Sequence, residues 1–346
     1  MTPIIRQASH AGSWYTDNGT KLDRSLSSWL ERVDPSKFPL PDSVTHHEAN
    51  SSKSRQVSLP IRGCKGVIGP HAGYSYSGAA AAWAYKCIDT TGIKRVFILG
   101  PSHHVYLDGC ALSKCDEYET PLGNLKLDKQ TITELASTKE FSTMSLQTDE
   151  DEHSIEMHLP YIFKVFEGCD IRIIPILVGA IDTAKEQHFG KILSPYLEND
   201  ENIFVVSSDF CHWGSRFSYT YYRPTNTSAA VQLTSRSAPS SYATCPIHHS
   251  IRQLDGEGIS AISFPSLNVG KKGATQARDE FAKYIKETRN TVCGRHPIGV
   301  LLGALADSES RGKTSECSFT RYEQSSECLH PKDSSVSYAS AYFKFT

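Results

Sequence analysis

The sequence predicts an α/β fold in which one mostly parallel or mixed sheet is flanked by helices. Short apolar runs, suited to strands buried on both faces, recur along the chain, and stretches suited to helices lie between them. Strands that alternate with helices indicate βαβ units, whose strands pair in parallel. We expect residues 1–346 to form a single domain, because α/β chains of this length often do.

Four apolar runs predict the central strands, and each leads into residues that favour turns. They are residues 66–69, 95–99, 172–178 and 203–206. Glycine, proline or serine follows each run directly, which is typical of a strand end. Residues 336–345 are rich in Tyr, Phe, Ser and Ala and alternate roughly, so they predict a final strand.

Three segments predict helices. Residues 78–87 are rich in alanine. Residues 154–166 carry apolar side chains at helical spacing and follow the acidic residues 149–152, which suit a helix N-terminus because negative charge complements the helix dipole there. Residues 297–306 begin with proline, a preferred first helical residue.

The composition narrows the classes of function. The chain is 39% hydrophobic and 21% charged with a formal net charge of -2, so it predicts a globular protein that binds neither nucleic acid nor an anionic membrane surface. We find no apolar run long enough for a membrane span, and no secretory signal. Ten scattered cysteines indicate reduced thiols, and therefore a cytoplasmic or nuclear protein. The polar stretches near 43–56 and 223–243 predict exposed insertions.

His71, His103 and His212 occupy equivalent places, a few residues after predicted strands. In a parallel sheet these points lie together at the carboxyl edge, where open α/β folds bind ligands. Imidazole is the commonest metal ligand near neutral pH. We therefore expect three rings from distant parts of the chain to converge on one crevice, although each could also be an ordinary polar residue at a strand end.

Cys293 is the fourth candidate because it lies just ahead of the predicted helix at Pro297. A helix N-terminus and the neighbouring Arg295 would both lower the pKa of its thiol. The thiolate form is both a nucleophile and a metal ligand. A small, inert core residue is the alternative interpretation.

Other residues are candidates for the wall of the pocket. Trp14 and Tyr76 lie in segments that contain glycine, although aromatic residues are commoner in cores than in pockets. Asp209 could orient a ligand histidine through its second nitrogen or cap a helix. Phe210 or Trp213 is expected to pack behind His212.

The run from Thr148 to Pro160 resembles a metal-binding motif only at first sight. His153 and His158 are five residues apart, which places them about 140° apart around a helix. They could not bind one ion from a regular helix. His153 and Glu156 remain candidates for polar lining of the pocket.

Several long stretches of the chain resemble the Memo family, named for its mediation of receptor-driven cell motility. The resemblance spans nearly the whole chain and departs from the compact family pattern at the two polar insertions. The matching stretches are ASHAGSWY, PHAGYSYSG (70–78), FILGPSHHV (97–105), MSLQTDEDEHSIEMHLPY (144–161), FVVSSDFCHWG (204–214), CGRHPIGVLL (293–302), and QSSEC with DSSVSYA (324–339).

The resemblance implies a fold similar to class III extradiol ring-cleaving dioxygenases. Those enzymes hold non-haem iron with two histidines and one carboxylate, and use a further histidine as acid and base. In this resemblance His71 and His103 match the two ligands, His212 matches the acid/base residue, and Cys293 stands where the dioxygenases have glutamate. A thiolate is softer than a carboxylate, so the resemblance implies iron or copper and puts the ancestral reaction in doubt.

Three functions follow as hypotheses. The first is a metal-dependent redox protein, in which His71, His103 and Cys293 bind the ion, acting in cell motility or invasive-growth signalling. The second is an adaptor whose vestigial active site binds phosphotyrosine peptides or a signalling protein, with Arg295 meeting the phosphate. The third is a hydrolase with Cys293 as nucleophile and His212 as base.

Overall fold

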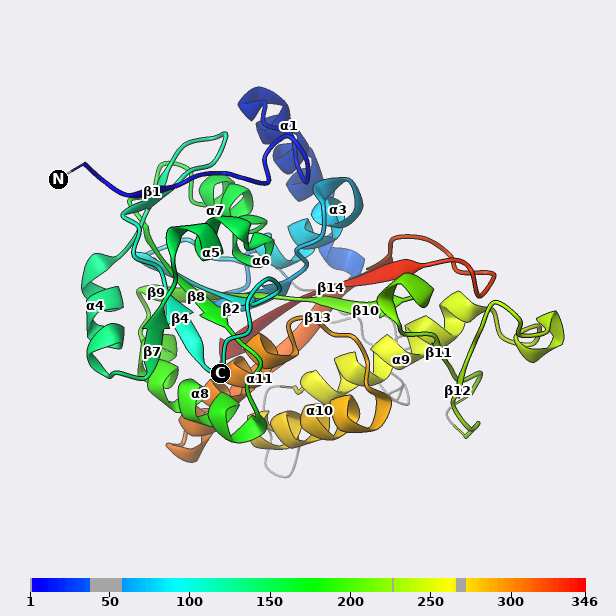
Figure 1. The fold of residues 1–346 in the computed structure, drawn as a ribbon. Coiled ribbons are helices and arrows are strands. Elements are labelled where there is room, and N and C mark those ends of the chain that lie inside the picture. The colour runs from blue at the N-terminus through cyan, green and yellow to red at the C-terminus, as the bar shows by residue number, and fades with distance from the viewer. Residues whose placement is uncertain (1, 38–57, 226, 266–271) are drawn as a thin grey trace.

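A nine-stranded mixed sheet runs through the centre of the computed structural model, which describes residues 2–37, 58–225, 227–265 and 272–346 (Figure 1). The strand order is β10-β14-β2-β9-β3-β8-β4-β7, and β13 pairs with β14. The strands of this sheet are β2 (Cys64–Gly69), β3 (Arg95–Pro101), β4 (Cys110–Leu112), β7 (Phe141–Thr143), β8 (Arg172–Val178), β9 (Asn202–Ser207), β10 (Asp209–Trp213), β13 (Ser315–Gln324) and β14 (Ser335–Phe345).

Four parallel strands, in the order β2-β9-β3-β8, form the middle of the sheet. These are the four strands that the apolar runs predict, and nearly all of their residues are buried. Burial on both faces explains why their sequences are continuously apolar rather than alternating.

Antiparallel strands extend the sheet on both sides, which makes it mixed. The predicted C-terminal strand is β14, and it pairs antiparallel with β2, β10 and β13. Strand β13 was not predicted, because its residues, SECSFTRYEQ, lack a continuous apolar run. The predicted α/β class, with a mixed sheet flanked by helices, is confirmed.

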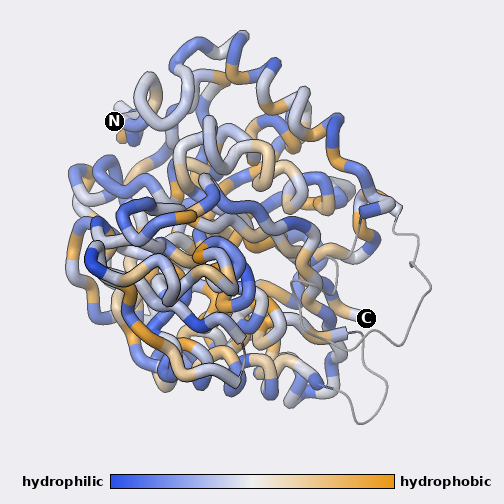
Figure 2. Tube along the Cα trace, turned by 90° about the vertical axis from the view of Figure 1, so that its right-hand side faces the viewer, coloured by the Kyte–Doolittle hydropathy of each residue, from blue (hydrophilic) through white to orange (hydrophobic). Residues whose placement is uncertain are grey.

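Helices cover both faces of the sheet. In Figure 1, α1, α3 and α5 to α7 lie on one side of the sheet, and α8 to α11 lie on the other. Figure 2 shows apolar segments concentrated toward the interior, where one large core joins residues from Tyr15 to Phe343. The helices are α1 (Gly19–Glu31), α3 (Tyr74–Tyr85), α4 (Lys129–Ser137), α5 (Leu146–Asp151), α6 (His153–Glu156), α7 (Leu159–Val165), α8 (Thr183–Glu198), α9 (Ile247–Ile262), α10 (Ala274–Thr288) and α11 (Arg295–Ser310).

The prediction of one helix over residues 154–166 is wrong. Two short helices, α6 and α7, replace it, and α5 precedes them. Pro160 lies in the first turn of α7. Proline has no N–H to donate to the carbonyl of Glu156, so a single helix cannot run through this point.

The remaining elements lie toward the surface. Two small sheets contain β1 (Ile5–Arg6), β5 (Glu117–Tyr118) and β6 (Leu125–Lys126), and β11 (Tyr221–Tyr222) with β12 (Val231–Gln232). Strand β12 belongs to the polar stretch 223–243, whose described residues are mostly exposed. The stretch 43–56 lies outside the described residues. Short 3-10 helices are η1 (Pro35–Lys37), η2 (Ser215–Phe217) and η3 (Pro239–Ser241).

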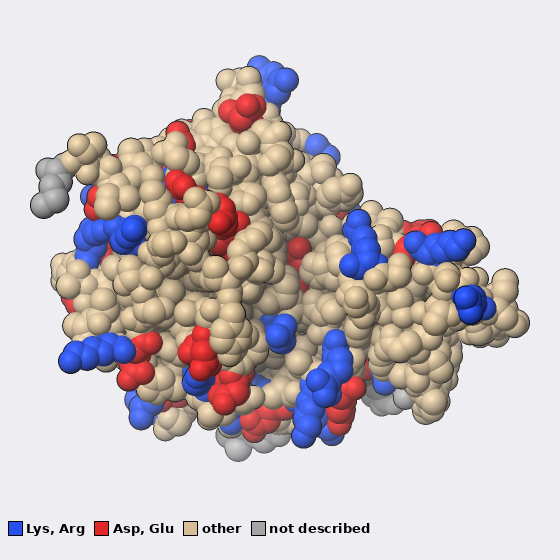
Figure 3. All heavy atoms as spheres, in the orientation of Figure 1, with Lys and Arg blue, Asp and Glu red and all other residues tan. Residues whose placement is uncertain are grey.

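The surface mixes charges of both signs. Figure 3 shows lysine and arginine interspersed with aspartate and glutamate over the visible face. Within the described part of the chain, no helix combines the length and apolar character needed to cross a membrane. All ten cysteines are described and free.

Candidate metal centre

Cys293 and three histidines meet where the central parallel strands end. His71 lies two residues after β2, and His103 lies two residues after β3. Strand β9 lies between β2 and β3 and leads through Ser208 into β10, which carries His212. Cys293 comes from a distant part of the sequence, two residues before α11. Since the ends of neighbouring parallel strands coincide, these side chains reach one crevice.

The donor atoms of His71, His103 and Cys293 are close enough to share one metal ion. His71 Nε2 lies 3.1 Å from Cys293 Sγ, and the ring centroids of His71 and His103 are 5.2 Å apart. One ligand atom from each of the three residues lies within 4.8 Å of the other two. Ligand atoms bound to one ion at about 2.0–2.3 Å lie roughly 3–4 Å apart, so these donors fit a metal ion. Asp209, His212 and Cys293 form a second set with the same spacing.

Hydrogen bonds to Nδ1 fix the tautomers of two of these histidines. Ser207 Oγ donates to the carbonyl of Ser154 at 2.7 Å, so it accepts the Nδ1 proton of His71 at 2.6 Å. A carboxylate oxygen of Glu152 lies 2.9 Å from His103 Nδ1, and an ionised carboxylate can only accept. Each ring therefore carries its proton on Nδ1 and keeps the Nε2 lone pair free for a metal ion.

The same tautomer follows for His212. Its Nδ1 lies 3.0 Å from the carbonyl oxygen of Phe210 and 3.2 Å from that of Thr291, and both oxygens can only accept. Burial lowers the pKa of His212, and burial with the neighbouring imidazoles holds the pKa of His71 well below its usual range. These rings are therefore neutral near pH 7, which is the form that binds a metal.

The predicted low pKa of Cys293 is wrong. Burial and the carboxylate of Asp209 raise the pKa of this thiol well above its ordinary value. Its Sγ accepts a hydrogen bond from the main-chain N–H of Asp209 at 3.2 Å. Arg295 lines a separate cavity between α8 and α10. The thiol is therefore protonated near neutral pH, and a metal ion that binds its sulfur must displace the proton.

Asp209 contacts the main chain of the site rather than a ring nitrogen. Its Oδ1 accepts the main-chain N–H of His71 at 2.9 Å. The residue is 2% exposed, and burial raises its pKa to about 7. The expectation that it orients a ligand histidine through the ring, or caps a helix, is wrong. Asp209 therefore anchors the main chain of His71, two residues after β2, and helps to fix the position of its ring.

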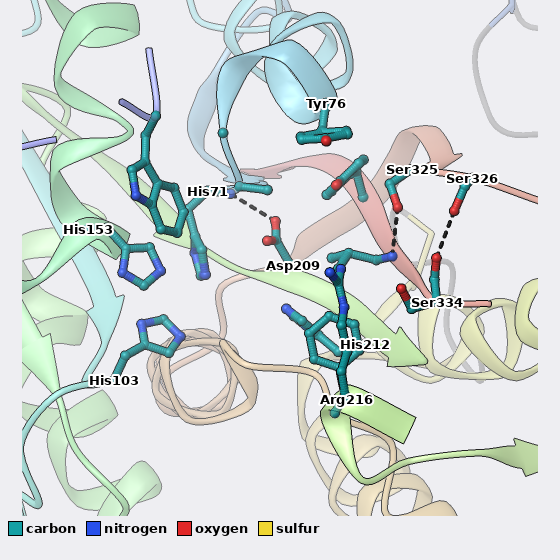
Figure 4. A pocket seen from close by; sticks show the side chains of 16 residues that line it. His71, Tyr76, His103, His153, Asp209, His212, Arg216, Ser325, Ser326 and Ser334 are labelled. Atoms are coloured by element: carbon teal, nitrogen blue, oxygen red, sulfur yellow. Dashed lines mark hydrogen bonds between the residues drawn. The ribbon is translucent and has the colours of Figure 1, made fainter. Parts of the chain in front are cut away.

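A cavity of about 650 Å³ opens beside these residues (Figure 4). His71, His103 and His153 lie on one side of it. Trp14 and Tyr76 also line it and form its rim, since 36% and 62% of their surface is exposed. The other side is polar and carries the residues Arg216, Ser325, Ser326 and Ser334.

Sequence reasoning missed this polar wall. Arg216 lies in η2, only four residues after His212, but a lone arginine in a loop carries no signal of its own. The serines come from the turn between β13 and β14, and β13 was itself not predicted. Phe210 and Trp213 lie on the same strand as His212, and both are fully buried.

The acidic run places its two histidines in different environments. His153 lines the cavity between two rings, with centroids 4.4 Å from His103 and 4.3 Å from Trp14. His158 is buried in the core, where its Nδ1 lies 2.7 Å from the hydroxyl of Tyr85. The two histidines therefore cannot share one ion.

Glu156 belongs to the core rather than to the cavity wall. Its carboxylate lies 2.8 Å from the guanidinium of Arg6, and both side chains are fully buried. It also accepts hydrogen bonds from His10 and from the hydroxyl of Tyr15. This network holds the N-terminal segment against α6, and so places Trp14 at the rim of the cavity.

The fold and the site define a class of protein: an α/β protein with a histidine-lined pocket at the carboxyl edge of a mixed sheet, and a buried cysteine beside the histidines. The chain belongs to the Memo family, since the family model described as "Memo-like protein" matches residues 6–342.

Known proteins resemble this chain over nearly its full length. Protein MEMO1 of Homo sapiens is 45% identical over 338 residues, which cover 97% of this chain and 96% of the relative. Protein MEMO1 of Danio rerio is 44% identical over 340 residues, with the same two coverages. Protein memo-1 homolog of Caenorhabditis elegans is 40% identical over 336 residues, which cover 97% of this chain and 81% of the relative.

Among solved structures, the crystal structure of uncharacterized protein JW3007 from Escherichia coli K12 matches with a TM-score of 0.35 and 12% sequence identity. The match covers 80% of this chain and 98% of that chain.

Proposed function

We propose that this protein binds iron or copper through His71, His103 and Cys293 and uses the ion in redox chemistry. The observation that carries the proposal is the convergence of two imidazoles and a thiol, with one ligand atom of each lying within 4.8 Å of the others. Two nitrogen donors and one soft sulfur donor suit a transition metal better than magnesium or calcium, which prefer oxygen.

In this proposal the metal ion and His212 would have different roles. When bound, iron or copper would supply one-electron chemistry and polarise a small molecule beside it. His212, neutral and with Nε2 unprotonated, can accept a proton from a bound molecule. Alternatively, His212 can serve as a fourth ligand of the ion, and Asp209 is close enough to be a further one. The cavity of about 650 Å³ has room for a small substrate.

Metal stoichiometry tests this function directly. The protein is purified without oxygen, loaded with iron(II) or copper(I), and its bound metal is measured by mass spectrometry. We expect about one ion per chain in the wild type and a large loss in His103→Ala. His188→Ala is the control, because His188 pairs with Glu140 on the surface. Unchanged metal content in His103→Ala would overturn the proposal.

The cellular role that we propose is cell motility or invasive-growth signalling, in the cytoplasm and nucleus. It is supported by membership of the Memo family and by ten free thiols, which suit a reducing compartment. Migration of cells that lack the protein tests this role. Wild-type protein should restore migration and His103→Ala should not, whereas equal rescue would show that the metal site is dispensable.

A second candidate function is an adaptor that binds phosphotyrosine peptides. The polar wall supports it, because Arg216 and the hydroxyls of Ser325 and Ser334 can donate to a phosphate while the exposed Tyr76 covers the ring. A phosphotyrosine peptide would be titrated against metal-free and metal-loaded protein, and against Arg216→Gln. Arg295→Gln is the matched control, because Arg295 lines another cavity. Affinity that is indifferent to metal but lost in Arg216→Gln would favour the adaptor.

The third hypothesis, a hydrolase, has less support. The imidazole nitrogen next to Cys293 Sγ is Nε2 of His71 at 3.1 Å, rather than a nitrogen of His212. The raised pKa of Cys293 also opposes its use as a free nucleophile.

A further inference from the structure

Both carboxylate oxygens of Glu152 accept hydrogen bonds from His103. One oxygen lies 2.9 Å from His103 Nδ1, and the other accepts the main-chain N–H of His103 at 2.7 Å. The side chain of Glu152 is only 2% exposed. A single carboxylate therefore fixes both the backbone and the ring of His103.

Glu152 is itself held from two directions. The oxygen that faces the His103 ring also accepts the main-chain N–H of Ser154 at 2.9 Å, at the start of α6. The carbonyl oxygen of Glu152 accepts a hydrogen bond from the buried guanidinium of Arg6 at 3.0 Å. Nδ1 of His153 lies 3.6 Å from the same carboxylate, which is too far for a hydrogen bond. These contacts make the carboxylate a fixed acceptor for His103.

The partner of His103 differs from the partners of the other two histidines. His71 Nδ1 meets the hydroxyl of Ser207, and His212 Nδ1 meets main-chain carbonyl oxygens. Only His103, among these three, has an anionic partner. A carboxylate on Nδ1 increases the electron density at Nε2, and so strengthens its bond to a metal.

We propose that Glu152 is a positioning residue for the metal centre: it holds His103 in the Nδ1–H tautomer, fixes its ring, and makes its Nε2 the stronger imidazole donor. This inference rests on the proposed function, in which His103 binds the metal, and it assigns a role to a residue that sequence reasoning placed in a helix start. The assignment follows from the two hydrogen bonds to His103 and the burial of the carboxylate.

Metal affinity in matched variants tests the role. Glu152→Gln keeps the size of the side chain, but its amide group must turn an N–H toward one of the two donors of His103. We expect the affinity for copper(I) and iron(II), measured by competition with a chromophoric chelator, to fall about 10- to 100-fold. Glu186→Gln is the control, because Glu186 forms a partly buried pair with His296 at 2.7 Å outside the pocket. Its affinity should match the wild type.

The outcomes separate this inference from the proposed function. If His103→Ala loses the metal while Glu152→Gln binds it like the wild type, the role of Glu152 is refuted and the metal site stands. If His103→Ala also binds like the wild type, the proposed function itself fails.

A second measurement works even where Glu152→Gln does not fold. In wild-type protein without metal, ¹⁵N chemical shifts of labelled histidine report which ring nitrogen carries the proton, and the His103 signal is assigned by its loss in His103→Ala. We expect the Nδ1–H tautomer, and a mixture of tautomers in Glu152→Gln. An Nε2–H tautomer of His103 in the wild type would overturn the inference.

Discussion

Thr291 and His212 are joined by three hydrogen bonds. The main-chain N–H of His212 donates to Thr291 Oγ1 at 2.7 Å, and this hydroxyl donates to the carbonyl of His212 at 3.1 Å. Nδ1 of His212 donates to the carbonyl of Thr291 at 3.2 Å. Thr291 lies two residues before Cys293, so the segment that carries this proposed metal ligand also holds His212, the histidine proposed for proton transfer. The position of the His212 ring relative to Cys293 is therefore fixed.

Replacing Thr291 by valine should weaken this connection. Thr291→Val leaves the N–H and carbonyl of His212 without partners, and leaving such groups unsatisfied costs about 1–3 kcal/mol. We expect the free energy of unfolding in urea to fall by this amount. Thr291→Ser keeps the hydroxyl and should stay close to the wild type. Equal stability of the valine and serine variants would show that the hydroxyl contributes nothing.

Replacing Cys293 by serine should change which metal the site prefers. A thiolate is a soft ligand that favours copper(I), whereas a hydroxyl is hard and tolerates iron(II) better. In Cys293→Ser we expect copper(I) affinity to fall on the order of 100-fold, or about 3 kcal/mol, and iron(II) affinity to fall less. Competition titrations of both metals measure the difference. Cys169→Ser, at an exposed cysteine, is the control. A uniform loss for both metals would contradict the role of sulfur softness.

The central fold could be predicted because its signals are local. Residues 173–178 are buried on both faces in β8, so their sequence is apolar throughout and is followed by a glycine. His71 and His103 could be singled out because parallel strands bring their ends to one edge of the sheet. Strand β13 and the break at Pro160 show the limits. Strand β13 has no continuous apolar run that would indicate a strand. Pro160 indicates a helix break, but the helical spacing of the apolar residues around it favoured one continuous helix.

The remaining parts of the site depend on contacts that sequence spacing does not encode. Glu152 reads as helix-start chemistry, and it does accept the N–H of Ser154, but its main partner is His103, 49 residues away. Cys293 precedes a helix, yet burial beside Asp209 outweighs the helix terminus and raises its pKa. Local sequence indicates which groups are present, whereas burial determines their charge.

The buried pair of Arg6 and Glu156 should make stability depend on pH in acid. Burial alone would raise the pKa of Glu156, but hydrogen bonds from His10 and the charge of Arg6 outweigh it and lower the pKa from 4.5 to about 2. The contribution is therefore complete above pH 4.5 and is lost as pH falls toward 2. It amounts to about 3 kcal/mol. Glu156→Gln should lose this part of the pH dependence.

Urea unfolding at several pH values measures this effect. At neutral pH, Glu156→Gln should also be less stable by about 3–5 kcal/mol, because a buried cation has lost a partner. Glu167→Gln, at an exposed carboxylate that pairs with Lys164, is the control and should follow the wild type. If wild type and Glu156→Gln lose stability in parallel between pH 4.5 and 2, the pair does not set the acid response.

Gly294 should be required for the position of Cys293. A Cβ built on Gly294 would lie 2.2 Å from the carbonyl oxygen of Ser207 and 2.4 Å from the Cβ of Ser208, so only glycine lets α11 begin this close to the end of β9. Gly294→Ala must push the start of α11 away, at a cost of about 1–3 kcal/mol, and carry Cys293 with it. We expect weaker copper(I) binding together with lower stability. Gly109→Ala is the control, since the nearest atom to its added methyl group would be 3.8 Å away. Copper(I) affinity unchanged in Gly294→Ala would show that this close approach does not position the thiol, and that the ligand geometry comes from β2 and β3 alone.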